Sequence, residues 1–483
     1  MLTFKVSAGW MVAIFSSVIN FLILIKYQLD MGGTFPYEDE WGYVNRLSQI
    51  HSMGFYQFLF NKYQIYFVPG LFFIWYLFYH FFDLSIMAIR KVGAVTSAIS
   101  SLLICAVILK QKSFFSPWEL FLVALIPFVF CSLNYWATYN QSIEAMIEPF
   151  LLGCVILAIW AGQQSLIMYS NLKKTLFWSG LVIIFTLLSM SMYAPGLSIL
   201  LAIAITRMLF LRKVDGTSLA LGGVGLSIGV AYSFLGGGLA EHHIHFFQIF
   251  SGKFLEEWIL LFGNSLITIG HPHSPIFYVF GFPITYYERV VVDFIFGFIV
   301  FSCIFTSMLY AIFVQMLNRI RYFVPFALSL YTIGVSIEIA LTHHSPRFGE
   351  APRYAILMVG APIAVVLWGI LIPKQLTMVR TVTGLAQAVV SVSVITTLIF
   401  VKIKMPQLKS FKSIKLILWK IDAPITKDQQ KILKVNDPLR NLVYPDIQYL
   451  KKNHLACFRD VGKPENFSGR NSMDIPQVGS AKK

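Results

Sequence analysis

Charged residues are scarce in this 483-residue chain: they make up 13% of it, whereas soluble globular proteins average about 25%. Cysteines are few and odd in number, five in all, and four of them lie inside apolar runs, so neither a disulfide framework nor a zinc site is predicted. The strict apolar–polar alternation of porin strands is also missing. These absences exclude an ordinary soluble domain, a small disulfide-rich secreted protein and a porin.

Apolar residues dominate instead, at 57% of the chain, and the mean hydropathy is +0.69. About 20 apolar residues in a helix cross roughly 30 Å of hydrocarbon. The sequence therefore predicts an all-α polytopic membrane protein, with a transmembrane domain over residues 1–402. We expect about eleven spans, at 7–25, 86–109, 117–134, 143–162, 176–193, 195–211, 218–236, 290–314, 322–341, 355–372 and 381–402. The first has no cleavage site and is interpreted as an uncleaved span.

Basic residues predict the orientation, because short loops rich in Lys and Arg stay in the cytoplasm. With eleven spans, five basic loops fall on one side: Lys110/Lys112, Lys173/Lys174, Arg207/Arg212/Lys213, Arg319/Arg321 and Lys374/Arg380. This arrangement places the N-terminus in the cytoplasm. Three long polar segments, 27–85, 237–289 and 342–354, are predicted to be periplasmic.

Two segments test this topology. Residues 63–82 are apolar enough to span, but counting them as a span would invert every later loop and break the charge rule, so a re-entrant or interfacial helix is predicted. The tail, 403–483, carries 16 Lys/Arg against 7 Asp/Glu. A basic tail can bind anionic lipid in the cytoplasm, but the span count places it outside, where we expect a small C-terminal extramembrane domain.

An acidic triplet, Glu38, Asp39 and Glu40, follows the first span. Adjacent carboxylates repel one another, which is expected to raise the pKa of at least one of them, as a general base requires. The triplet could alternatively hold a divalent cation, or be no more than a solvated acidic loop.

Arginines in the segment THHSPRFGEAPRY break the charge rule, because the segment is predicted to lie outside. The planar guanidinium group matches phosphate oxygens, so Arg347 and Arg353 predict a phosphate-bearing ligand at the outer leaflet. The alternative is a surface ion pair with a neighbouring glutamate. The other candidate residues in this segment are His343, His344 and Tyr354.

Weaker candidates lie elsewhere on the predicted outer face. Asn140 and Gln141 belong to an aromatic and amide cluster suited to hydroxyl-rich ligands, and Arg90 and Lys91 could either meet a phosphate or only extend to the interface. The segment FLEEWILLFGN, within 237–289, is predicted to be an amphipathic helix lying on the membrane surface. The nearby EHHIH sequence lacks a fourth ligand for zinc.

The order of these motifs resembles the GT-C superfamily of membrane glycosyltransferases. The series DEW, NKYQIYFVPGLFF, NYWATYNQS, LLFGNSL, PRFGEAPRY and YPDIQYLKKNHLACF is similar to bacterial proteins that include phage-derived, serotype-converting O-antigen glucosyltransferases. The resemblance spans most of the chain, although each motif is short and degenerate. It implies a polyprenyl-phosphate sugar donor, a glycan acceptor such as lipopolysaccharide O-antigen, and an active site on the periplasmic face of the bilayer.

The resemblance also assigns roles to residues. Asp39 and Glu40 would be catalytic, and Arg347, Arg353 and Tyr354 would bind the donor phosphate. Related proteins often have a His-Arg pair where this chain has Lys62, which can replace one charge but not the planar fork. The resemblance implies inverting transfer of a hexose, with glucose as the expected sugar. The alternatives are a lipid-linked glycan flippase or an O-antigen polymerase; a nucleic-acid partner is not expected.

Overall fold

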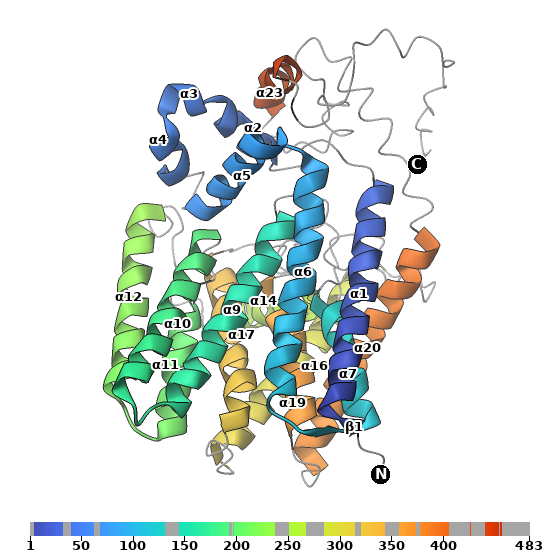
Figure 1. Cartoon of the computed structure of the whole chain (residues 1–483). Helices are drawn as coiled ribbons and strands as arrows, with labels where there is room; N and C mark the ends of the chain where they lie inside the picture. Colours follow the sequence, from blue (N-terminus) through green and yellow to red (C-terminus); the bar gives the residue numbers. More distant parts are fainter. Residues whose placement is uncertain are drawn as a thin grey trace.

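A computed structural model of the chain describes residues 4–31, 40–61, 68–130, 144–192, 196, 198–236, 251–266, 285–313, 320–342, 357–372, 377–404, 426, 440–453 and 455. Helices make up almost all of this part (Figure 1). They are α1 (Val6–Met31), α2 (Glu40–Ser48), α3 (Ile50–Met53), α4 (Phe55–Phe60), α5 (Pro69–Phe82), α6 (Ile86–Leu109), α7 (Pro117–Phe130), α9 (Glu144–Ile167), α10 (Leu172–Met192), α11 (Ser198–Leu211), α12 (Gly216–Gly236), α14 (Gly252–Asn264), α16 (Tyr286–Phe313), η5 (Ile320–Tyr322), α17 (Phe323–Thr342), α19 (Gly360–Leu371), α20 (Thr377–Lys404) and α23 (Arg440–Lys452).

Seven helices in the described part are long and apolar enough to cross a membrane: α1, α6, α9, α10, α16, α17 and α20. Each coincides with a predicted span, so the prediction of a multi-pass helical membrane protein is confirmed at this level. The remaining predicted spans coincide with the shorter apolar helices α7, α11, α12 and α19.

One end of the bundle gathers the basic loops, and we call it the basic end. A two-stranded ribbon, β1 (Phe4–Lys5) and β2 (Phe114–Phe115), joins the start of the chain to the α6–α7 loop. The Gln111 amide donates to Gln163 Oε1 (3.0 Å), and the Gln163 amide donates to the Ile320 carbonyl (2.8 Å). These bonds connect the loop after α6 with the last turns of α9, and α9 with η5 at the start of α17.

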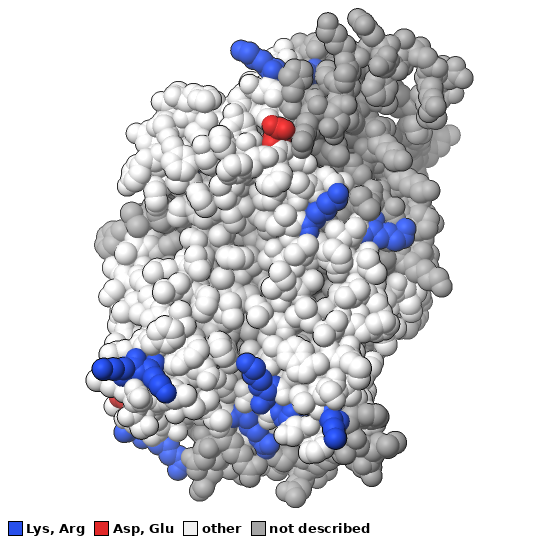
Figure 2. All heavy atoms as spheres, viewed as in Figure 1, with Lys and Arg blue, Asp and Glu red and all other residues white. Residues whose placement is uncertain are grey.

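One lysine and one arginine side chain add further hydrogen bonds at the basic end. Lys112 Nζ donates to the Ile370 carbonyl at 3.0 Å, and Arg207 donates to Ser165 Oγ at 2.6 Å. On the face drawn in Figure 2, groups of blue Lys and Arg side chains lie at the lower end, below a white band in which no described charged side chain is visible. The described parts of the five predicted basic loops therefore share one end, as the charge rule required.

The opposite end carries a helical cap, which we define as α2, α3, α4, α5 and α23 (Figure 1). Its core is an apolar cluster, separate from that of the bundle, which includes Trp41, Phe72, Trp75, Ile447 and Leu450. The described part of the tail therefore shares its core with the first long polar segment. Whether the remaining tail forms a small domain of its own stays a prediction.

Helix α5 covers most of the segment predicted to be re-entrant or interfacial. It has 14 residues, about 21 Å of helix, which is too short to cross the bilayer unaided. Gly70, near its start, lies so close to Ser191 and Met192 at the end of α10 that a Cβ atom there would collide with them. The helix therefore starts against the cap end of the bundle; its interfacial depth stays a prediction.

The position of helix α14 in the structure differs from the predicted one. Its sequence indicated a helix lying on the membrane surface, and the helix exists, but its second half is buried against α16 and α17. Gly263 lies against the Asp293 backbone, and Trp258 Nε1 donates to Ser336 Oγ at 2.7 Å. An amphipathic pattern is the same for a surface helix and for one packed along a neighbour, and here the close contact with α16 decides between them.

Candidate functional site

The described residue that follows Asp39 lies at the cap end. Helix α2 starts at Glu40, directly after Asp39. Its next residue, Trp41, is fully buried, and Tyr43 meets the rings of Phe72 and Trp75 edge-on, each with ring centres 5.8 Å apart. The aromatic face of α2 thus fixes the start of the helix, and with it the backbone position of Glu40, on the cap.

Arg46 connects α2 to the end of α4. Its guanidinium group donates to the carbonyl oxygens of Phe58 (3.0 Å from Nε) and Asn61 (2.6 Å from Nη2), and its Cζ lies 3.9 Å from the centre of the Phe72 ring. The carbonyls at the end of a helix have no partner within it, so Arg46 satisfies them. Sequence reasoning missed this role; the available signal was one arginine within an otherwise apolar face.

The tail helix α23 is attached to α2 by a buried polar contact. Asn45 Nδ2 donates to Asp446 Oδ1 at 3.2 Å, and Asp446 is fully buried. Burial raises the pKa of Asp446 to about 7, although the hydrogen bond from Asn45 opposes this rise. Tyr449, one turn further along α23, contacts Tyr79 of α5. The motif YPDIQYL therefore serves to dock the tail on the cap.

Two buried charged side chains, on neighbouring helices, lie in the bundle beneath the cap. Arg90 of α6 is 4% exposed and Glu148 of α9 is 7% exposed. The two helices are in close contact between them, because a Cβ atom on Gly93 would collide with the Ala145 carbonyl. Arg90 also interacts electrostatically with Tyr27 at the end of α1. Charges inside membrane helices are costly and mark functional sites by default, which makes this pair a candidate that the sequence only half revealed.

The structure distinguishes Arg90 from Lys91, the two adjacent residues that were predicted as weaker candidates. Arg90 is buried among α1, α6 and α9, whereas Lys91 is exposed. Of the two, only Arg90 is placed to act on a ligand between the helices, and Lys91 behaves as a surface residue.

The other predicted site residues lie outside the described residues: Glu38, Asp39, Lys62, Asn140, Gln141, His343, His344, Arg347, Arg353 and Tyr354. Some of their described flanks are at the cap end, but the start of α19, which follows Tyr354 in the chain, lies against Leu328 and Thr332 in the first half of α17. Asn61 ends α4 in the cap, α9 starts there, and α17 ends there at Thr342, about 30 Å along its axis from the basic end. The structure thus groups some of the segments without placing the side chains.

Two further acidic side chains, missed by sequence reasoning, are buried at α14 and α16. Asp293 of α16 is fully buried where Gly263 lies against its backbone, and Glu257 of α14 is buried as well. Asn264, also fully buried, completes a polar patch at the end of α14. Among the described residues, no three His, Cys, Asp or Glu side chains are grouped so as to hold a metal ion.

No family model, curated protein or solved structure matches the chain. A functional assignment therefore depends on the residues of this chain and on the order of its motifs.

Proposed function

We propose that this protein is a GT-C-type membrane glycosyltransferase that moves a hexose, such as glucose, from a polyprenyl-phosphate donor to a glycan of the O-antigen kind. In this proposal all eleven apolar segments span the inner membrane, the basic end faces the cytoplasm, and the cap end faces the periplasm. The donor's lipid tail stays in the bilayer while its sugar phosphate reaches the space beneath the cap.

The observation that supports the proposal most is the docking of α2 on the cap. Glu40 starts a helix whose next residue, Trp41, is buried, and α23 holds the same helix through Asn45 and Asp446. A general base has to be held within hydrogen-bonding reach of the proton that it removes. A helix fixed on two sides gives the adjacent carboxylates of Asp39 and Glu40 such a support.

The mechanism that we infer is a single in-line displacement. The Asp39 carboxylate takes the proton of an acceptor hydroxyl, and the hydroxyl oxygen attacks the anomeric carbon. The bond from that carbon to the donor phosphate oxygen breaks, and its electron pair leaves with the polyprenyl phosphate. The configuration at the anomeric carbon inverts. Glu40 would orient the acceptor or bind a divalent cation.

The departing phosphate gains negative charge, so cations near it lower the barrier. Arg347 and Arg353 are assigned this role by the motif order, with Tyr354 as a hydrogen-bond donor and Lys62 as a further charge. Arg90 is a candidate from the structure, because it is buried between helices close to the cap end. A phosphate leaves as a stable anion, and no general acid is needed.

A flippase for a lipid-linked glycan is the second candidate. Transporters place charges within their helices, and Asp293, Glu257 and Glu148 are buried in helices of this bundle. A flippase would move its lipid without breaking a bond, so the two functions differ in their product.

A transfer assay separates these two functions. The purified full chain in bacterial lipid would be given polyprenyl-phosphate hexoses, glucose first, with lipid-linked O-antigen as acceptor. The proposal expects a glycan heavier by one hexose for one donor, together with free polyprenyl phosphate. Unchanged glycan with every donor, combined with movement of the labelled lipid between leaflets, would favour the flippase.

A further inference from the structure

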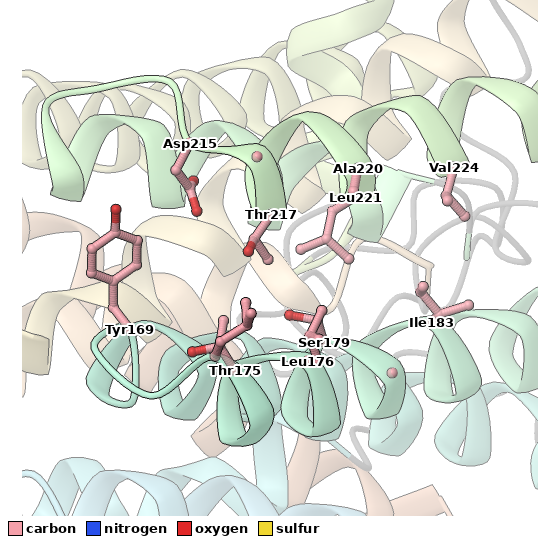
Figure 3. Close-up of a pocket in the computed structure, with 13 residues that line it drawn as sticks. Tyr169, Thr175, Leu176, Ser179, Ile183, Asp215, Thr217, Ala220, Leu221 and Val224 are labelled. Atoms are coloured by element: carbon pink, nitrogen blue, oxygen red, sulfur yellow. The ribbon is translucent and has the colours of Figure 1, made fainter.

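A groove runs along the bundle between α10 and α12, starting at the basic end and far from the cap (Figures 1 and 3). Its volume is about 620 Å³, within the range of pockets that hold small organic ligands. Its lining comes from α10, from α12 and from the turns before each of these helices.

The two ends of the groove differ in chemistry. Tyr169, Asp215 and Thr217 bring oxygen atoms to one end, whereas Ile183 and Val224 leave the other end apolar (Figure 3). The mouth of the groove is also apolar, since Leu172 is 69% exposed and Leu176 58% exposed. In a membrane helix, such exposed side chains face lipid, so the groove is open to the bilayer.

Positive charge surrounds the polar end. Lys213 Nζ lies 4.7 Å from the centre of the Tyr169 ring, and Arg212, Lys173 and Lys174 are exposed nearby in the chain. Helix α12 starts at Gly216 beside them, and because Asp215 already accepts a hydrogen bond from the Ser218 amide of this helix, the exposed cations are the groups left to bind an anion.

The acidic residue in the lining does not offset this charge. Asp215 pairs with buried Arg207 at 3.0 Å and accepts hydrogen bonds from Ser218. Burial alone would raise the pKa of Asp215, but Ser218 and Arg207 outweigh it and hold that pKa below its usual value. Its charge is therefore neutralised by Arg207, and the exposed cations next to it remain available.

Ser179 provides an independent sign of a ligand. Its side chain lines the middle of the groove and is 7% exposed, and its hydroxyl oxygen has no hydrogen-bond partner among the described residues. A buried hydroxyl without a partner loses free energy that a bound molecule can restore. An ester or glycerol oxygen, between a head group and an acyl chain, would be a suitable acceptor at this depth.

We propose that this groove binds an anionic phospholipid from the leaflet at the basic end. Its phosphate head group lies over the start of α12, close to Lys213 and Arg212. One acyl chain follows the apolar side chains towards Ile183 and Val224, and Ser179 donates to an oxygen in the ester region. The site is separate from the proposed donor site, which lies at the other end of the bundle.

Two glycines allow a matched test. A Cβ atom on Gly180, which lines the groove, meets nothing within 4 Å, and the same holds for Gly223, which is on α12 outside the groove lining. Gly180→Leu fills the groove, Gly223→Leu does not, and each replaces a helical glycine with a better helix former. Ala220→Leu is a second groove-filling change, on the opposite helix.

Native mass spectrometry of the full chain in detergent would count bound phosphatidylglycerol, with phosphatidylcholine and inorganic phosphate as comparison ligands. We expect the wild type and Gly223→Leu to retain phosphatidylglycerol at the same level, and Gly180→Leu and Ala220→Leu to retain at least tenfold less. A double Arg212→Gln, Lys213→Gln variant should lose the preference over phosphatidylcholine. Equal retention by the Gly180→Leu and Gly223→Leu variants would overturn the proposal. So would displacement of the lipid by millimolar phosphate, which indicates a phosphate site only.

Discussion

Asn45 donates a hydrogen bond of 3.2 Å to Asp446 across 401 positions of sequence. The bond joins α2, which starts at the last residue of the acidic triplet, to α23, the only tail helix in the described part of the chain. Ile447 and Leu450 enter the same apolar cluster as Trp41 and Val44. The tail is thus a structural part of the cap, and its docking fixes the helix that starts at Glu40.

Docking of the tail should weaken as the pH rises. The pKa of Asp446 is about 7 in the folded cap, against about 3.9 in an unfolded chain. A raised carboxyl pKa means that the folded state binds the proton more tightly, so stability is full below about pH 4, falls as the pH rises to 7 and is constant above it. The loss is at most roughly 4 kcal/mol, from 1.36 kcal/mol per pKa unit.

Hydrogen exchange of α23 measures this effect. We expect less protection of residues 440–452 at pH 8 than at pH 5.5, after correction for the intrinsic exchange rate. The Asp446→Asn variant keeps an acceptor for Asn45 without a charge, and should be protected equally at both values. An equally large pH effect in that variant would mean that another group controls the docking.

Arg46→Ala should destabilise the cap by roughly 1–3 kcal/mol, because it leaves the buried carbonyl group of Phe58 and the partly buried one of Asn61 without this donor. Arg46→Lys should recover only part of this loss, since an ammonium group cannot reach both carbonyls while lying flat on the Phe72 ring. Lys91→Ala, at an exposed position, is the control and should be neutral. Thermal unfolding followed by cap tryptophan fluorescence would compare the three.

Close packing of α14 on α16 should make Gly263→Ala strongly destabilising. The added methyl group would collide with the backbone and the side chain of Asp293, which cannot move without shifting α16. Gly384→Ala is the matched control, because a Cβ atom on this α20 glycine meets nothing within 4 Å. We expect poor yield of folded protein for the first variant and a normal yield for the second, by size-exclusion chromatography. Normal yields for both would show that α14 packs more loosely.

Replacement of Arg353 by lysine should lower hexose transfer far more than conservation of charge would suggest. Lysine keeps the positive charge but loses the planar fork that binds phosphate oxygens in pairs. We expect at least a tenfold fall in transfer at equal protein level. Lys91→Arg is the comparison and should transfer normally. Near-normal transfer by Arg353→Lys would indicate that Arg353 only extends to the interface or pairs with Glu350.

The sequence predicted the bundle well where local signals were strong. The predicted bounds of the span 86–109 are those of α6. The apolar run ends at Lys110 and begins after Ser85, whose side chain caps the helix by accepting a hydrogen bond from the Ala88 amide. The docking of the tail on α2 could not be predicted, because no local pattern links Asn45 to a residue 401 positions away. The placement of α14 failed for a similar reason, since the deciding contact between Gly263 and Asp293 is long-range.

The candidate site was predicted only in part. Charged residues in an apolar sequence are easy to find, and the structure places the start of α2, the end of α4 and the start of α9, which flank several of them, at one end of the bundle. Arg90 was found this way, but its burial was not foreseen, and Glu148 and Asp293 were missed because single acidic residues inside apolar runs carry no motif. Arg46 was missed because its partners are backbone carbonyls, which no side-chain pattern reveals.

The central claim is that the acidic residues beside the cap catalyse sugar transfer, and single-turnover transfer by amide variants tests it most directly. Asp39→Asn and Glu40→Gln keep the shape of the side chain and remove its basicity, while Glu38→Gln is the matched control. A general base contributes on the order of 10²–10⁴ in rate, so we predict a fall of that size for Asp39→Asn, a smaller fall for Glu40→Gln and a mild effect for Glu38→Gln. Transfer at the wild-type rate by both Asp39→Asn and Glu40→Gln would contradict the account.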